Sequence, residues 1–173
     1  MGSRLAAFCF AFVMALAVFP SASLAQKKDY LTDAEADKIR DADTPSERID
    51  LFISFAADRI KKLQFEIAHP AELHRDERIN ALINGYTGCV DDASDLIQLG
   101  VDKQQEIREA VKHMQSKGPE FLMALKEISA KGHAVDAYKD NLDDAVDATN
   151  DAIQDANDAI KELAPPPVRR RPQ

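Results

Sequence analysis

Cysteine is scarce in this sequence, and its scarcity excludes a fold stapled by disulfides. The 173 residues include two cysteines, and Cys9 lies in an N-terminal segment that we expect to be removed. A chain with one remaining cysteine cannot form an intramolecular disulfide. We expect Cys89 to lie buried within a helix, as free cysteines often do; the alternatives are an intermolecular disulfide or a cofactor tether. The Cys-x-x-Cys-His pattern of covalent haem attachment is absent from the sequence.

Glycine is also scarce, and the catalytic motifs that depend on it are missing. The six glycines form neither a phosphate-binding loop nor the Gly-x-Ser-x-Gly turn that presents a nucleophilic serine. Few glycines and short connections leave few loops on which an active site is usually built. Catalytic triads also assemble from residues far apart in sequence, but the missing motifs and the few loops favour a protein that is not an enzyme.

The first 25 residues have the three parts of a secretory signal peptide. Arg4 supplies the positive charge, residues 5–19 form an uncharged apolar run, and Pro20 ends that run. The closing Ser-Leu-Ala places small residues at the two positions that signal peptidase recognises. The run is shorter than the ~20 apolar residues that a transmembrane helix needs. We therefore expect residues 1–25 to be cleaved off after Ala25. The mature chain should be periplasmic or extracellular, without a transmembrane anchor.

Acidic residues outnumber basic ones in the expected mature chain. The whole sequence has 22 Lys and Arg against 30 Asp and Glu, and Arg4 is the one charged residue among the first 25, which leaves a formal charge of −9. This charge argues against nucleic acid as a partner, because phosphate binding depends on basic surface. About 150 residues are enough for one domain with a hydrophobic core of its own.

Two helix-start signals follow a short leader. Each is a capping box, in which a Thr and a Glu three residues later satisfy each other's backbone N–H groups: Thr32 with Glu35, and Thr44 with Glu47. Pro45 suits the first helical position after the second cap. We expect a leader and a short helix in residues 26–43, with a break near Asp43, and a helical bundle domain over residues 44–164. The proline- and arginine-rich residues 165–173 should form a disordered tail.

Three long segments carry apolar residues at alternating spacings of four and three, which is typical of helices that pack in a bundle. The members are Ile49, Ile53, Ala56, Ile60, Leu63 and Ile67 in the first segment, Ile79, Ile83, Tyr86, Val90, Ala93 and Ile97 in the second, and Ile107, Val111, Met114, Gly118, Phe121, Leu125 and Ile128 in the third. We expect Gly100 to cap the second helix and Asp102 to begin the next one. The third pattern continues through Pro119, so that helix should be kinked but unbroken.

The last segment is the most regular in the chain. Three near-copies of a seven-residue unit run from Asp143 to Leu163, and Ala145, Ala152 and Ala159 occupy the same position in each. Small side chains at that position let another helix approach closely. Packing inside the bundle is the preferred interpretation of this seam, and self-association of two chains is the alternative. The many Asp residues of the segment predict a solvated face or a surface for a basic partner.

These segments together predict an all-α protein. No segment alternates with the two-residue period of a β-strand, so a sheet is not expected. Four long amphipathic helices joined by short connections should form an up-down bundle, preceded by the short helix and the signal peptide. The alternative is a three-helix arrangement in which residues 73–130 form one very long helix. We prefer the turn, because two flanking helices would cover the apolar face of such a helix poorly.

Ligands for a metal or haem are few. Glu66 and His69 form one Glu-x-x-His pair, whereas a di-iron bundle needs two such pairs and further Glu residues. A haem would need axial ligands such as His113 and Met114 to come from separate helices. We expect Met114 in the core, His113 partly exposed, and no cofactor. The sequence therefore predicts an exported, non-enzymatic bundle that binds a macromolecule or has a structural role in the cell envelope. A metal- or haem-binding bundle is the alternative.

Overall fold

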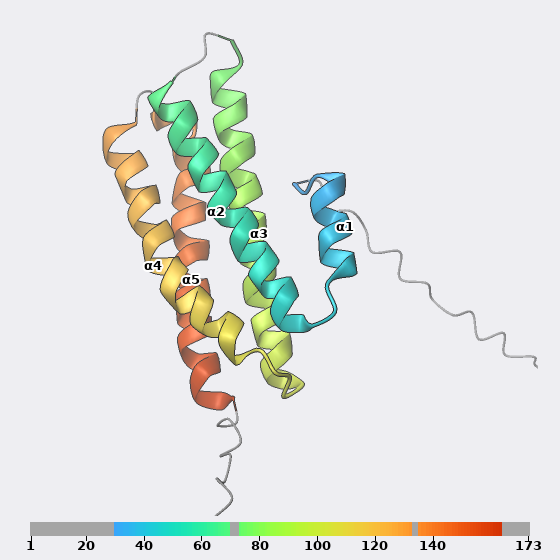
Figure 1. Ribbon diagram of the computed structural model, residues 1–173. Helices are drawn as coiled ribbons and strands as arrows, with labels where there is room; N and C mark the ends of the chain where they lie inside the picture. The colour runs from blue at the N-terminus through green and yellow to red at the C-terminus, as the bar shows by residue number, and fades with distance from the viewer. Residues whose placement is uncertain (1–29, 70–72, 133–134, 164–173) are drawn as a thin grey trace, which may run out of the picture.

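The computed structural model describes residues 30–69, 73–132 and 135–163, and this part of the chain contains helices and no strand. The elements are α1 (Asp33–Asp41), α2 (Pro45–Ala68), α3 (Arg75–Asp102), α4 (Arg108–Lys131), the short 3₁₀ helix η1 (Val135–Ala137) and α5 (Lys139–Glu162). The four long helices run up and down side by side, and α1 lies outside them (Figure 1). The predicted all-α bundle of four long helices is confirmed, and the arrangement with one very long helix is wrong.

Both predicted capping boxes are present at the starts of α1 and α2. The side chain of each Thr accepts a hydrogen bond from the backbone N–H of the Glu three residues later, and that Glu bonds back to the backbone of the cap. Pro45 occupies the first turn of α2, where its missing N–H costs nothing. The predicted break near Asp43 is therefore confirmed, since α1 ends at Asp41.

The core lies between the four long helices and is built from the predicted seams. All seam residues of α2, α3 and α4 are buried except Ile67, which is half-buried. The pairs α2–α3, α4–α5 and α3–α5 pack extensively, and α2 meets α4 along a less extensive contact. One polar pair stands inside the core, where the Tyr86 and Thr149 hydroxyls lie 2.7 Å apart. Burial raises the pKa of Tyr86, so this phenol stays neutral.

The end of α3 corrects the expected role of Gly100. The helix continues through Gly100 to Asp102, and Gln104 takes the left-handed conformation that ends it, with φ 51°. The N–H of Gln105 bonds the Gly100 carbonyl at 2.8 Å, which completes a Schellman cap. Gly100 serves packing instead, because a Cβ there would lie 2.5 Å from the Ile107 side chain. The next helix begins at Arg108, so the start expected at Asp102 is also wrong.

Helix α4 is continuous through Pro119, as the phase of its apolar residues predicted. The neighbouring Gly118 is buried, and a Cβ on it would lie 2.5 Å from the Ile153 side chain of α5. This glycine therefore allows α4 and α5 to approach closely at the proline. Pro119 itself is exposed, which keeps its ring out of that contact.

The alanine seam of α5 packs inside the chain. Ala145, Ala152 and Ala159 are all buried among the other helices, so a second chain has no access to them while the bundle is folded. Cys89 is buried as well, in agreement with the preferred interpretation of that residue. A surface for a partner must accordingly be sought elsewhere.

Several sequence predictions lie outside the described residues. These are the signal peptide in residues 1–25, the leader up to residue 29, and the tail over residues 165–173. Among the residues that are described, no helix is long and apolar enough to span a membrane.

Candidate functional site

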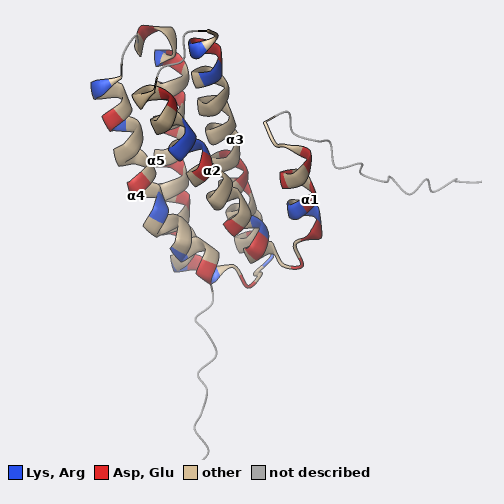
Figure 2. Cartoon of the chain, turned by 45° about the horizontal axis from the view of Figure 1, so that its top comes forward, with Lys and Arg blue, Asp and Glu red and all other residues tan. Residues whose placement is uncertain are grey.

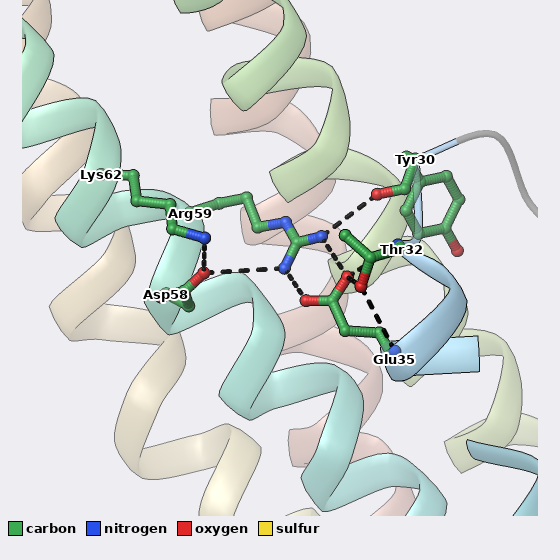
Figure 3. Close-up of polar contacts among 6 residues, drawn as sticks. All are labelled: Tyr30, Thr32, Glu35, Asp58, Arg59 and Lys62. Atoms are coloured by element: carbon green, nitrogen blue, oxygen red, sulfur yellow. Dashed lines mark hydrogen bonds and ion pairs between the residues drawn. The ribbon is translucent and has the colours of Figure 1, made fainter. Parts of the chain in front are cut away.

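A buried arginine holds the N-terminal segment against the bundle. Arg59 of α2 is 6% exposed, and its guanidinium donates to both carboxylate oxygens of Glu35, at 2.8 Å for Nη2 to Oε2. The same Nη2 donates to the Tyr30 carbonyl at 3.1 Å. Two parallel bonds to a carboxylate are the strongest arrangement that arginine offers. Figure 3 shows the guanidinium between Asp58 on its own helix and the segment of Tyr30 to Glu35, which we call the strap.

The ion pair keeps both partners charged. The hydrogen bonds from Arg59 and Thr32 together lower the pKa of Glu35 to about 2, with the bond from Arg59 contributing most and burial acting in the opposite direction. Glu35 thus has two tasks, because the same carboxylate completes the capping box of α1. The pKa of Arg59 is raised by its bond to Glu35. Neither group exchanges a proton near neutral pH, so the cluster is a clamp and not an acid–base pair.

Tyr30 fixes the other end of the strap to α3. Its hydroxyl donates to the Asp92 carboxylate, and its ring lies over Gly88, where a Cβ would be 2.6 Å from a ring carbon. Gly85, one turn earlier, faces the Arg59 side chain at ordinary contact distance. Leu31 is buried beside them. The strap therefore occupies a groove between α2 and α3 that is deepened by the missing side chains of two glycines.

A second, open groove runs between α2 and α4. It has two hollows in line, of about 430 and 300 Å³, which share Gln64 and Ala124 as lining residues. Apolar side chains form the floor: Ile53, Ala57, Ile60, Ile67, Phe121 and Ile128. Polar side chains form the rim, and most of them come from α4: Lys61, Gln64, His113, Lys117, Glu120, Glu127 and Lys131. Figure 2 shows acidic and basic residues interspersed along α2 and α4.

One end of this groove contains a histidine oriented by a carboxylate. His113 Nδ1 of α4 lies 2.8 Å from Asp50 Oδ1 of α2, and Ser54 lines the same hollow. These residue types resemble a hydrolytic triad, but a triad also needs free N–H donors for the oxyanion. Ser54 stands in the interior of α2, where the backbone N–H groups are used by the helix itself. The arrangement suits a tie between two helices better than catalysis.

The weak metal candidates have other contacts. Glu66 accepts from Arg78 at 3.3 Å, and His69 Nδ1 lies 3.2 Å from the Phe65 carbonyl at the end of α2. The part of the chain that the structure describes contains no group of three or more His, Cys, Asp or Glu side chains placed to hold a metal ion. Met114 is buried and His113 is half-buried on the same helix, one residue apart.

The strap and the groove were both missed by sequence reasoning. A signal for Arg59 exists, because it continues the stripe of Phe52 and Phe55 at a spacing of four and therefore falls on the buried face. The spacing of three between Gly85 and Gly88 likewise places both on one face of α3. Nothing local predicts that Glu35, already explained as a capping residue, would also pair with α2.

Comparison with known proteins gives no match to guide assignment. No family model matches the chain, and no curated protein or solved structure is significantly similar to it.

Proposed function

We propose that the mature chain is an exported, non-enzymatic binding protein that takes an amphipathic helix of a partner protein into the groove between α2 and α4. The observation that carries this proposal is the pair of hollows in line between those two helices. Helix-in-groove recognition uses an apolar floor for one face of the incoming helix and a polar rim for its flanks. This groove has both.

The dimensions fit a helix of several turns. The lining residues of α2 extend from Ile53 to Ala68, which corresponds to about 20 Å along the axis at ~1.5 Å per residue. An elongated, open trough of this kind encloses a compact small molecule poorly, whereas ligand pockets usually bury most of their ligand. A partner helix laid in the trough would cover the half-buried Ala57 and Ala124.

The rim charges are easily exchanged for those of a partner. Lys117 pairs with Glu120 at 2.7 Å and Lys131 with Glu127 at 2.8 Å, each within α4 and exposed to solvent. Exposed pairs of this kind contribute little to stability, about 0–1 kcal/mol. A helix with both acidic and basic flanking residues therefore replaces them at little cost. The net acidic charge of the chain further favours a protein over a nucleic acid as the occupant.

Export rests on the N-terminal signal pattern described above. The binding surface would then work in the periplasm or outside the cell.

Filling the groove tests the proposal. Ala57→Trp and Ala124→Trp place a large side chain on the groove floor, and Asp151→Trp on the exposed face of α5 is the matched control. Each full-length variant is expressed in the native host and treated with an amine crosslinker, and adducts are resolved by mass. We expect one defined adduct in the wild type and in Asp151→Trp that is lost in both groove variants. An adduct that survives groove filling would exclude this surface.

A further inference from the structure

We propose that the groove between α2 and α3 also accepts the strap of a second copy of this chain, giving a dimer in which two straps are exchanged. This inference concerns a different surface from the α2–α4 groove and does not depend on it. The occupant is identified by the structure itself, because the groove is already filled by this sequence.

The strap supplies the buried ion pair and the buried apolar residue that hold α1, and the half-buried Ile39 of α1 also packs against the core. Helix α1 has no buried residue of its own, and its contact with α2 is slight. What fixes it is the buried Leu31, the bond from Tyr30 to Asp92 and the paired bonds of Glu35 to Arg59. An element held by so few groups opens at a lower free energy than the bundle unfolds.

The linker permits exchange. Ala42 and Thr44 have extended backbone, with φ −64° and −122°, and the capping box of α2 satisfies Thr44 and Glu47 without help from α1. Opening this linker breaks the bonds from the Asp43 N–H to Glu47, at 2.9 Å, and from Arg48 to the Ala42 carbonyl, at 3.1 Å, but it leaves the capping box of α2 in place. In an exchanged dimer each strap would make the same contacts with its partner as it makes within one chain, which is the condition for domain swapping.

The groove matches this segment at both ends. The Tyr30 ring lies against Gly88 at one end, and the Glu35 carboxylate meets Arg59 at the other. Within one chain the strap competes at an effective concentration in the millimolar range. Exchange in the wild type therefore requires high protein concentration, and a test must remove the competing internal strap.

Charge reversal removes that competitor. Glu35→Arg and Arg59→Glu each place like charges at the clamp, so neither variant closes on itself. When the two are mixed, the unchanged Glu35 of one chain meets the unchanged Arg59 of the other, and the two reversed groups also form an opposite pair. We expect each variant alone to be monomeric and their mixture to give a heterodimer, measured by native mass spectrometry. The double variant Glu35→Arg/Arg59→Glu, which restores the pair within one chain, should be monomeric and serves as the folding control.

A peptide-binding experiment tests the groove without the Arg59→Glu variant, in which a buried residue of α2 is replaced. The Glu35→Arg variant has an unchanged α2–α3 groove, and a labelled peptide of residues 30–42 should bind it by fluorescence anisotropy. The matched peptide with Glu35→Gln should bind about tenfold more weakly, because it loses the charge-assisted pair. Absence of a heterodimer at concentrations where the peptide binds would overturn the exchange, and absence of peptide binding would overturn the groove.

Discussion

At the scale of single residues, the Glu35 side chain has two structural roles in the clamp. Glu35 completes the capping box of α1 and also neutralises Arg59, so the start of a helix and its attachment to the bundle depend on the same carboxylate. Removing one member of a buried ion pair leaves the other without compensation and is more costly than replacing both. Arg59 is the more buried member of the pair. Loss of the Glu35 carboxylate therefore leaves a buried positive charge uncompensated and detaches the strap from α2.

The pH dependence of the clamp follows from the pKa of Glu35. Because the folded pKa is about 2 and the ordinary value is 4.5, the unfolded chain takes up a proton first as pH falls. The stabilisation is therefore complete above about pH 4.5 and is lost as pH falls toward 2. Chemical unfolding of the wild type and Glu35→Gln should differ by about 2 kcal/mol at pH 7. We expect this difference to shrink across that window, and a constant difference from pH 7 to 2 would contradict the assignment.

Two neighbouring glycines give a matched pair of variants. Gly88→Ala brings a methyl group within 2.6 Å of the Tyr30 ring and should displace the strap, whereas Gly85→Ala meets its nearest atom at 3.6 Å. Alanine improves a helix interior by up to about 1 kcal/mol over glycine, so Gly85→Ala should be stabilising. The measurement is the rate of tryptic cleavage after Lys38 and Arg40. We expect faster cleavage in Gly88→Ala alone, and equal rates in the two variants would refute the described fit of Tyr30.

At the scale of elements, the end of α3 offers a stabilising substitution. Gln104 holds a left-handed conformation that costs a residue with a side chain roughly 1 kcal/mol and costs glycine almost nothing. Gln104→Gly should therefore raise the free energy of unfolding by up to about 1 kcal/mol, less the lost bond from its amide to the Val101 carbonyl. Thermal unfolding measures the effect. A lower melting temperature for Gln104→Gly would contradict the left-handed conformation assigned to residue 104 in the Schellman cap of α3.

The helix starts and the buried helix faces could be predicted because their signals lie between neighbouring residues in the sequence. Capping boxes placed the starts of α1 and α2, and the four-three spacing placed the buried faces of the long helices, because both signals lie within a few residues. Gly100 was misjudged because its reason for being glycine is Ile107, beyond the turn. The clamp could not be predicted because its two residues are far apart in the sequence. Arg59 and Glu35 meet only because α1 folds back on α2.

At the scale of the whole molecule, the bundle separates a closed side from an open one. The contacts of α3 with α2 and α5 are extensive, and the strap covers part of the α2–α3 boundary. The contact of α2 with α4 is the less extensive one and leaves the hollows described above. The alanine seam of α5, the first candidate for association from sequence, is used up within the core. We therefore propose this open side as the place where a partner helix adds to the bundle.

The proposed export makes a prediction of its own. Protein recovered from the periplasm or medium should have the mass of a chain beginning at Gln26, because small residues at the end of the signal direct cleavage there. Ala25→Lys should block that cleavage, since the peptidase pocket excludes a long charged side chain, while Gln26→Asn just beyond it should not. Intact mass spectrometry distinguishes the products. A recovered chain that retains residues 1–25 would contradict the signal assignment.

The groove itself is tested most directly by site-specific photo-crosslinking in the native host. A photoreactive residue replaces Ala124 on the groove floor in one variant and Asp151 on the outer face of α5 in another, and the captured partner residues are mapped by mass spectrometry. We predict adducts from position 124 alone, on partner residues spaced three and four apart as on one face of a helix. Equal capture from position 151, or captured residues without that helical spacing, would contradict the account.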